Sequence, residues 1–86
     1  MRLDKFLSAA RIFKSRSLAN EAITSSMVFI GNLPAKPSQE VRSGLIVEID
    51  TPRAYRKIEI LSLPPKNMSK KDASLLYRLI EERIKD

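Results

Sequence analysis

The 86-residue chain contains neither cysteine nor histidine. Without cysteine there are no disulfide bonds and no thiol chemistry, and without histidine the commonest zinc ligand and proton shuttle are missing. The scattered serines and carboxylates form no recognisable nucleophile–base or acid–base arrangement. We therefore expect a protein that is not an enzyme and that has no metal, cofactor or small-molecule substrate.

Long hydrophobic runs are missing as well. No uninterrupted apolar stretch reaches the length of a signal peptide or a membrane span, and Asp4 and Lys5 interrupt the N-terminus. No predicted helix combines a broad apolar face with a mainly basic polar face, which disfavours binding to a membrane surface. These absences favour a cytoplasmic protein without a membrane partner.

Positive charge is what the chain has in excess. Sixteen Lys and Arg against ten Asp and Glu give a net charge of +6. Residues 1–57 hold ten basic and five acidic residues, whereas residues 58–86 hold six and five, so the excess lies in the first part. A basic excess favours polyanionic partners, nucleic acid before an anionic membrane.

Aromatic residues are few, at 6% of the chain. Phe6, Phe13 and Phe29 fall in segments that we expect to pack in the core. Only Tyr55 and Tyr77 are then available to stack on a base. An interleaved basic and aromatic surface for single strands is therefore absent. With an RNA partner, we expect recognition of shape and phosphates rather than of sequence.

The first part of the chain predicts two helices. Residues 3–10 place apolar side chains at the i, i+3, i+4, i+7 spacing of one buried helical face. Ser15 or Ser17 can cap a second helix, whose apolar side runs over residues 18–23. At 86 residues, the chain makes one domain with a small core.

The middle of the chain follows a two-residue period and predicts strands. Gly31 and Asn32 suit a two-residue hairpin turn in which glycine takes the first, positive-φ position. Pro34 cannot donate a ladder hydrogen bond, so the segment after the turn must lie at a sheet edge. Residues 45–49 and 56–61 are predicted as further strands, the latter with its isoleucines facing the core.

After the Pro64-Pro65 pair, an apolar stripe predicts a C-terminal helix over residues 70–85, with a capping box beginning at Ser69. The predicted fold is α+β, with two N-terminal helices on a small, mostly antiparallel sheet and this third helix. We expect residues 1–61 to form the main domain. Residues 62–86 would form the linker and the helix that packs on or beside it.

The cations expected to act together cluster around the two predicted helices. Arg11, Lys14 and Arg16 would surround the N-terminus of the second helix, where unpaired N–H groups and the helix dipole favour a phosphate. A solubility surface would mix both signs, and Asp4 is the only acid close in sequence. The expected patch for a folded RNA backbone consists of Arg2, Lys5, Arg11, Lys14 and Arg16, with Lys36 and Arg42 from the sheet.

These residues resemble the S4 RNA-binding domain, first defined in small-subunit ribosomal protein S4. The resemblance covers about residues 1–50 and rests on residues 2–7, 14–19, 23, 28–30, 36–38, 41 and 44. It implies an alpha-L motif that docks on structured RNA, with Asp4 orienting a neighbouring arginine. The RNA-facing positions that it implies are Arg2, Lys5, Arg11, Lys14, Ser15, Arg16 and Lys36.

A chain of this length that opens at Met1 with the domain is similar to the small ribosome-associated heat-shock S4 proteins. Those proteins bind the large ribosomal subunit, in particular subunits that carry a stalled nascent chain and its tRNA, and support recycling or quality control. The resemblance implies ribosomal RNA and the large subunit as partners, and it allows tRNA as a further one. We expect a monomer.

An alternative function is that of a small adaptor. Its C-terminal helix would bind a protein partner through Leu75, Leu76, Leu79 and Ile80, although this stripe is also expected to pack on the sheet of its own chain. Ser26 adds a structural expectation, because it stands where the S4 family usually has glycine. That position, at a helix C-terminus, favours the left-handed conformation.

Overall fold

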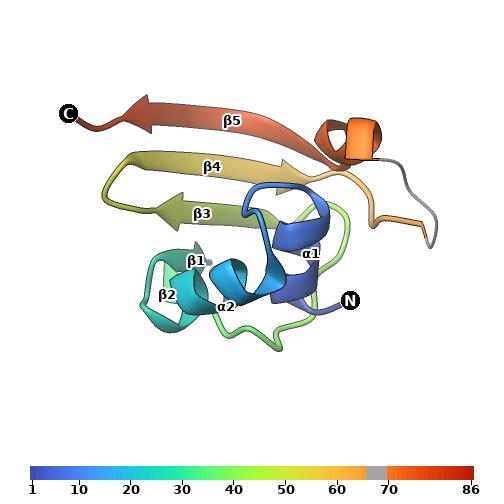
Figure 1. Cartoon of the computed structure of the whole chain (residues 1–86), viewed down its shortest axis with the longest axis horizontal. Coiled ribbons are helices and arrows are strands. Elements are labelled where there is room, and N and C mark those ends of the chain that lie inside the picture. Colours follow the sequence, from blue (N-terminus) through green and yellow to red (C-terminus); the bar gives the residue numbers. More distant parts are fainter. Residues whose placement is uncertain (66–69) are drawn as a thin grey trace.

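The computed structural model describes residues 1–65 and 70–86, and it forms two helices on one side of a five-stranded sheet (Figure 1). The strand order is β2-β1-β3-β4-β5, and all neighbours are antiparallel. The predicted α+β class is confirmed. The elements are α1 (Leu3–Ala9), α2 (Arg16–Thr24), β1 (Val28–Ile30), β2 (Leu33–Pro34), β3 (Ile46–Asp50), β4 (Ala54–Ile60), the 3-10 helix η1 (Lys70–Leu76) and β5 (Tyr77–Ile84).

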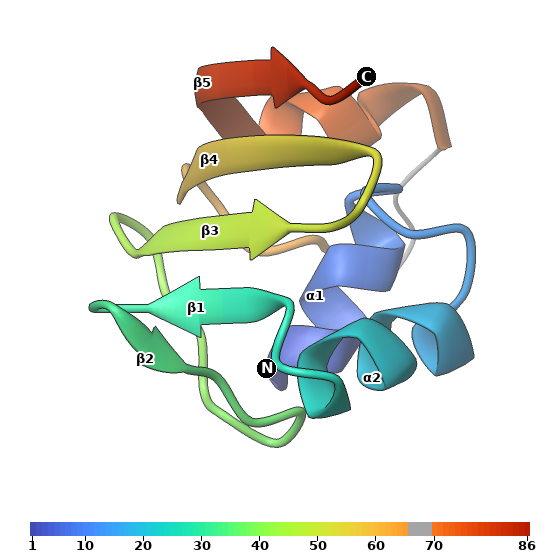
Figure 2. The ribbon, with the colours of Figure 1, turned by 90° about the vertical axis from the view of Figure 1, so that its left-hand side faces the viewer.

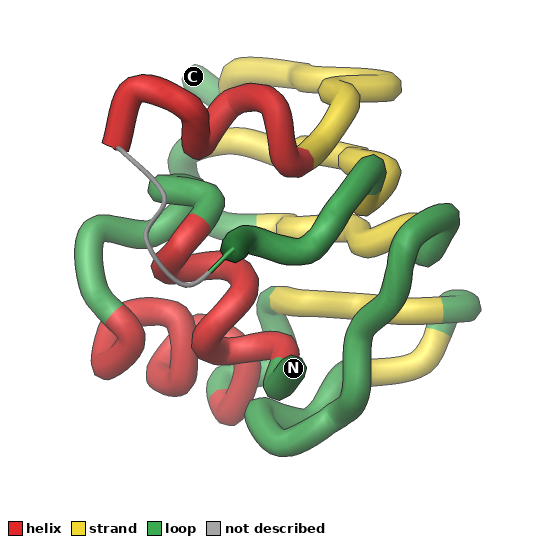
Figure 3. Tube along the Cα trace, turned by 90° about the vertical axis from the view of Figure 1, so that its right-hand side faces the viewer, coloured by secondary structure: helices red, strands yellow, loops and turns green. Residues whose placement is uncertain are grey.

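The core lies between the two helices and the sheet, which occupy opposite sides of the molecule in Figures 2 and 3. The predicted apolar face of the first helix is confirmed, because Leu3, Phe6, Leu7 and Ala10 are all buried. They pack in one cluster with buried residues of the second helix and of strands β1, β3 and β4. The sheet residues of that cluster include Val28, Val47, Ile49, Ile58 and Ile60.

The ends of the second helix follow local chemistry. Ser15 caps α2, since its Oγ accepts a hydrogen bond of 3.1 Å from the N–H of Leu18. Ser26, just beyond the helix, has a φ of 60°, so the expected left-handed conformation is confirmed. Arg11, in the connection between the helices, also has a positive φ of 59°, which the sequence did not indicate.

The predicted hairpin is present between β1 and β2. Gly31 and Asn32 have φ values of 61° and 65°, so both central residues of the turn are left-handed. This geometry corresponds to a type I′ turn, whereas glycine alone was expected to take a positive φ. The expected edge position of Pro34 is confirmed, because β2 ends the sheet.

The prediction of a helix over residues 70–85 is wrong. A 3-10 helix ends at Leu76, and residues 77–84 form β5, which pairs with β4 from Ile60↔Tyr77 to Ala54↔Ile84. Tertiary context overrides the helical stripe, because β4 offers an unpaired edge and the opposite charges of the two strands meet across it. The capping box at Ser69 lies outside the described residues.

This correction removes the basis of the adaptor hypothesis in its predicted form, because the stripe is divided between a short 3-10 helix and a strand. Leu76 is buried, whereas Leu75, Leu79 and Ile80 are exposed. In the described residues, no helix is long and apolar enough to cross a membrane.

Candidate nucleic-acid interface

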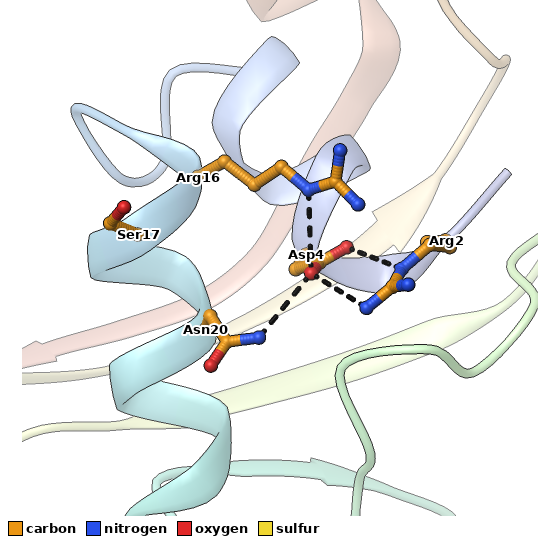
Figure 4. A pocket seen from close by; sticks show the side chains of 5 residues that line it. All are labelled: Arg2, Asp4, Arg16, Ser17 and Asn20. Carbon is orange, nitrogen blue, oxygen red and sulfur yellow. Dashed lines mark hydrogen bonds and ion pairs between the residues drawn. The ribbon is translucent and has the colours of Figure 1, made fainter.

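A buried carboxylate joins the two helices. Asp4, in the first turn of α1, is only 2% exposed. Arg2 Nε and Nη2 donate to its two oxygens, both at 3.2 Å, and Asn20 Nδ2 donates to Oδ2 at 3.4 Å (Figure 4). Arg16 Nε lies 3.4 Å from Oδ2, and the backbone N–H of Lys5 donates to Oδ1 at 2.8 Å. Asp4 therefore holds two arginines from different elements.

The Asp4 carboxylate is kept ionised by these partners. Burial alone would raise its pKa, but the hydrogen bonds from Arg2, Asn20 and the Lys5 N–H, together with the charge of Arg16, outweigh burial. The net effect is a pKa below the ordinary value of 3.8. At neutral pH the group is a fixed anion between two guanidinium groups.

The two arginines keep donors for a ligand. A guanidinium carries five N–H donors; Arg2 uses Nε and Nη2 on Asp4, and Arg16 presents Nε to it. Their side chains are 47% and 52% exposed. In Figure 4, the line from Arg16 to Asp4 starts at Nε, and one terminal nitrogen of Arg16 points away from Asp4. The two arginines, together with Asp4, Ser17 and Asn20, line a depression of about 440 Å³. The unused N–H groups of the arginines suit phosphate oxygens in this depression.

The loop that carries Lys36 lies against the start of the first helix. The N–H of Leu3 donates to the carbonyl of Gln39 at 2.8 Å, and the N–H of Asp4 donates to the carbonyl of Pro37 at 3.2 Å. Arg2 also forms an isolated β-bridge in this region. Lys36 is exposed, and its loop is held to the start of the first helix by these backbone hydrogen bonds.

The other predicted RNA-facing residues are not part of the cluster around Asp4. Lys5, Arg11 and Lys14 are exposed, and the structure records no contact between Arg11 or Lys14 and the Asp4 carboxylate within the described ranges. Ser15 has a structural task, since its hydroxyl caps the second helix. Arg42 lines a separate depression with Glu40.

Sequence reasoning missed Asn20 and Ser17. Asn20 follows Arg16 by four residues on a helix, so both side chains lie on one face. That spacing could have suggested the contact, but only if Asp4 had been placed beside the second helix. Ser17 lines the depression without a recorded partner in the described part of the chain.

Three cations of β4 and β5, and Lys85 just after β5, form ion pairs with carboxylates, whereas none is recorded for Lys57 of β4 in the described residues. The ion pairs are Arg56–Glu82 at 3.1 Å, Arg78–Glu59 at 2.7 Å, Arg83–Glu81 at 2.9 Å and Lys85–Asp50. By contrast, over residues 1–65 and 70–86 no ion pair is recorded for Lys5, Arg11, Lys14 or Lys36. Within the described residues, cations without a recorded ion pair thus occur around the helices, at the four positions just named, and also in the sheet region, at Arg42, Arg53 and Lys57.

Tyr55 is held within the sheet network. Its hydroxyl donates to Glu48 Oε2 at 2.6 Å, and the guanidinium of Arg83 lies 4.5 Å from the centre of its ring. The hydrogen bond to Glu48, with burial and the nearby carboxylates, raises the pKa of Tyr55 to about 12. The ring is already covered by a cation and is no open platform for a base.

Comparison with known proteins finds similar sequences and structures. The family model described as S4 domain matches residues 1–47. A Heat shock protein 15 homolog of Haemophilus influenzae is 35% identical over 85 residues, which are 99% of this chain and 65% of the relative. An RQC P-site tRNA stabilizing factor of Listeria monocytogenes is 33% identical, over 100% of this chain and 92% of the relative. The chain thus spans less than two thirds of the Haemophilus protein and nearly all of the Listeria protein.

Among solved structures, Heat Shock Protein 15 of Vibrio cholerae is similar, with a TM-score of 0.82 and 33% identity. The match covers 92% of this chain and 80% of the Vibrio chain. The solution structure of a hypothetical protein matches with a TM-score of 0.77 and 30% identity, over 94% of this chain and 98% of the other. The Vibrio structure is trimeric, so it does not support our expectation of a monomer.

Proposed function

Because this chain belongs to the S4 domain family, we propose that it binds structured ribosomal RNA of the large subunit and acts there without catalysis. The contact surface is the depression around Arg2 and Arg16 together with the exposed cations that flank it. The flanking cations are Lys5, Arg11, Lys14 and Lys36. Ser15 supports this surface by fixing the start of the second helix.

The observation that carries the proposal is the separation of compensated from uncompensated charge. The three arginines of β4 and β5 each pair with a carboxylate of their own, whereas Arg2 and Arg16 share one carboxylate, and no ion pair is recorded for the cations named above around them in the described part of the chain. A polyanion gains most where positive charge is uncompensated and donors are unused. Phosphates of a folded RNA fit this pattern, because contacts to them position a protein without reading sequence.

The biological setting that we propose is the recycling or quality control of stalled large subunits in the cytoplasm, with tRNA as a second RNA partner. Support comes from the relatives, one named for stabilising the P-site tRNA and the other for heat shock. The first is matched over nearly its whole length, so its functional unit has the size of this chain.

Co-sedimentation with ribosomal fractions tests the proposal. The tagged protein should sediment with free large subunits more than with intact ribosomes. The double variant Arg2→Ala/Arg16→Ala should lose this association, because each lost charged contact costs about 1–2 kcal/mol. The matched control is Arg78→Ala/Arg83→Ala, which removes the same charge from β5. Equal losses in both double variants would contradict a localised surface.

A further inference from the structure

A second depression lies where the α1–α2 connection meets the turn between β3 and β4 (Figure 2). Ile12 and Phe13 of the connection and Ala54 at the start of β4 form its apolar walls, and Thr51 and Arg53 line it from the turn. Its volume is about 140 Å³. We call it the loop–turn slot. It shares no residue with the depression around Asp4.

The size of the loop–turn slot limits what can enter. Pockets for drug-sized ligands measure roughly 300–1,000 Å³, whereas this one has about 140 Å³ and accepts a single flat ring system. Phe13 is half-buried and packs against the core, so its ring is held in place. A rigid aromatic wall in a narrow apolar slot favours a planar, stacking group.

Charge at the slot indicates that this ring is attached to an anion. Arg53 is exposed, and no ion pair is recorded for it in the described residues. Arg11 and Lys14 flank the two slot residues within the same connection, and both are exposed. Arg53 lines the apolar slot, and Arg11 and Lys14 are the sequence neighbours of the lining residues Ile12 and Phe13, a pattern that suits a base with its phosphates outside.

The slot also offers groups for the edge of a base. Arg56 lines it and forms an ion pair with Glu82 at 3.1 Å. A guanidinium donates to ring nitrogens and carbonyls, and a carboxylate accepts from amino groups, so the pair can serve a polar base edge. Arg53 and Arg56 are the charged side chains that line the slot, and Glu82 is linked to it through its ion pair with Arg56.

The turn side of the slot is preformed. The Thr51 hydroxyl donates to the carbonyl of Ala54 at 3.1 Å and accepts from its N–H at 3.3 Å. The carbonyl of Arg53 accepts a hydrogen bond of 2.9 Å from the N–H of Lys85. Because the backbone is fixed at both points, little ordering is needed when a ligand binds.

We propose that the loop–turn slot takes one unpaired nucleobase of the RNA that is held at the basic surface. The base stacks on Phe13, and the flanking phosphates contact Arg53, Arg11 and Lys14. Structured RNA presents such bases in loops and bulges, where they are splayed out and stack on aromatic side chains. This inference rests on the proposed RNA-binding function and adds a base contact to a surface that otherwise reads phosphates.

The probes for the test are the four ribonucleoside 5′-monophosphates, each titrated into the full chain. Ribose 5-phosphate, which has the sugar and phosphate but no base, is the control ligand. NMR resonances of the Phe13 ring and the Ala54 methyl should shift with at least one nucleotide and stay in place with ribose 5-phosphate. Equal shifts with ribose 5-phosphate, or none at either residue with any nucleotide, overturn the proposal.

Two variants test the contacts. Phe13→Leu keeps an apolar side chain and should weaken nucleotide binding roughly tenfold, the loss expected from one stacked base. Arg53→Gln lies on the exposed turn, leaves the core intact and should weaken binding severalfold. Arg78→Gln removes an exposed arginine of β5 that does not line the slot, and it should change nothing. Unchanged affinity in Arg53→Gln, or in a folded Phe13→Leu protein, overturns the proposal.

The same variants separate this inference from the proposed function. If nucleotides do not reach the slot but large subunits still bind in an Arg2- and Arg16-dependent way, the slot proposal fails and the function stands. If nucleotides fill the slot but large subunits are not bound, the function fails and the slot remains a nucleotide site.

Discussion

Asp4 and Arg16 connect the first turns of the two helices through an ion pair of 3.4 Å between Oδ2 and Nε. The carboxylate is buried, whereas the guanidinium is 52% exposed. The buried carboxylate of Asp4 therefore fixes the geometry of the pair, and the guanidinium of Arg16 is accessible to solvent. We infer that Asp4 positions Arg16 and that Arg16 contacts the ligand.

The first prediction reverses the expectation from bulk charge. Asp4→Asn makes the protein more positive, so diffuse attraction alone predicts tighter RNA binding. We expect weaker binding, by roughly fivefold to tenfold, because Arg2 and Arg16 lose the anion that orients them. Affinity for a large-subunit RNA fragment measures this. The matched control, Glu21→Gln on the exposed side of α2, removes the same charge and should bind at least as tightly as the parent.

The pH dependence of Asp4 follows from its lowered pKa. A carboxylate with a depressed folded-state pKa stabilises the protein fully above its unfolded value of 3.8, and this is lost as pH falls through the folded pKa. Asp4 should therefore contribute no change in stability between about pH 7 and pH 5. Acid melts should reveal its loss only below that range, and the loss should be absent in Asp4→Asn.

The second prediction concerns the salt dependence of RNA binding. If about four to six cations contact phosphates, log affinity falls against log salt with a slope of roughly −3 to −5. Arg2→Ala with Lys5→Ala should make the slope shallower by about one to two units. Lys70→Ala with Lys71→Ala removes equal charge and should leave the slope nearly unchanged. Equal changes of slope in the two double variants would contradict a localised surface and indicate diffuse binding of polyanions.

The third prediction concerns the left-handed residue after the second helix. Ser26 has a φ of 60°, a conformation that costs energy for any residue with a Cβ atom. Replacing it with glycine should stabilise the fold by about 0.5–1 kcal/mol. Thermal unfolding measures the change. A lower melting temperature for Ser26→Gly contradicts this expectation.

The fourth prediction concerns alkaline stability. Hydrogen bonding to Glu48, before the other causes, raises the pKa of Tyr55 from 10.0 to about 12. A raised folded pKa means that stabilisation is complete below pH 10 and is lost as pH rises through about 12. Unfolding curves across this range should show a loss in the parent that Tyr55→Phe lacks. Parallel curves would show that the hydroxyl is not held by Glu48 in solution.

Local chemistry made much of the helical part predictable. The spacing of Leu3, Phe6 and Leu7 defines a buried face, and the Ser15 cap is confirmed. The left-handed conformation of Ser26 was expected because it stands where the S4 family usually has glycine, at the C-terminus of a helix. The apolar spacing and the serine cap depend on residues within a few positions of one another, so the sequence alone carries them.

The secondary structure of the C-terminal segment could not be predicted from its local sequence. Residues 77–84 carry a stripe compatible with a helix, yet they extend the sheet beside β4. The pairing depends on a strand that lies some twenty residues earlier and on charges that meet across it, such as Arg78 with Glu59. When the pattern of a segment fits both a helix and a strand, its conformation depends on the pairing partner that the folded chain offers.

The sequence by itself determined the two N-terminal helices, the excess of basic residues in the first part and the membership in the S4 family that they indicate. Tertiary structure decided which charges meet. It brought Asp4 of one helix beside Arg16 and Asn20 of the other, and it paired Arg56 and Arg78 with carboxylates of the neighbouring strand. Both outcomes depend on contacts between residues far apart in the chain, because the strength of an ion pair is set by distance and burial in the folded state rather than by composition.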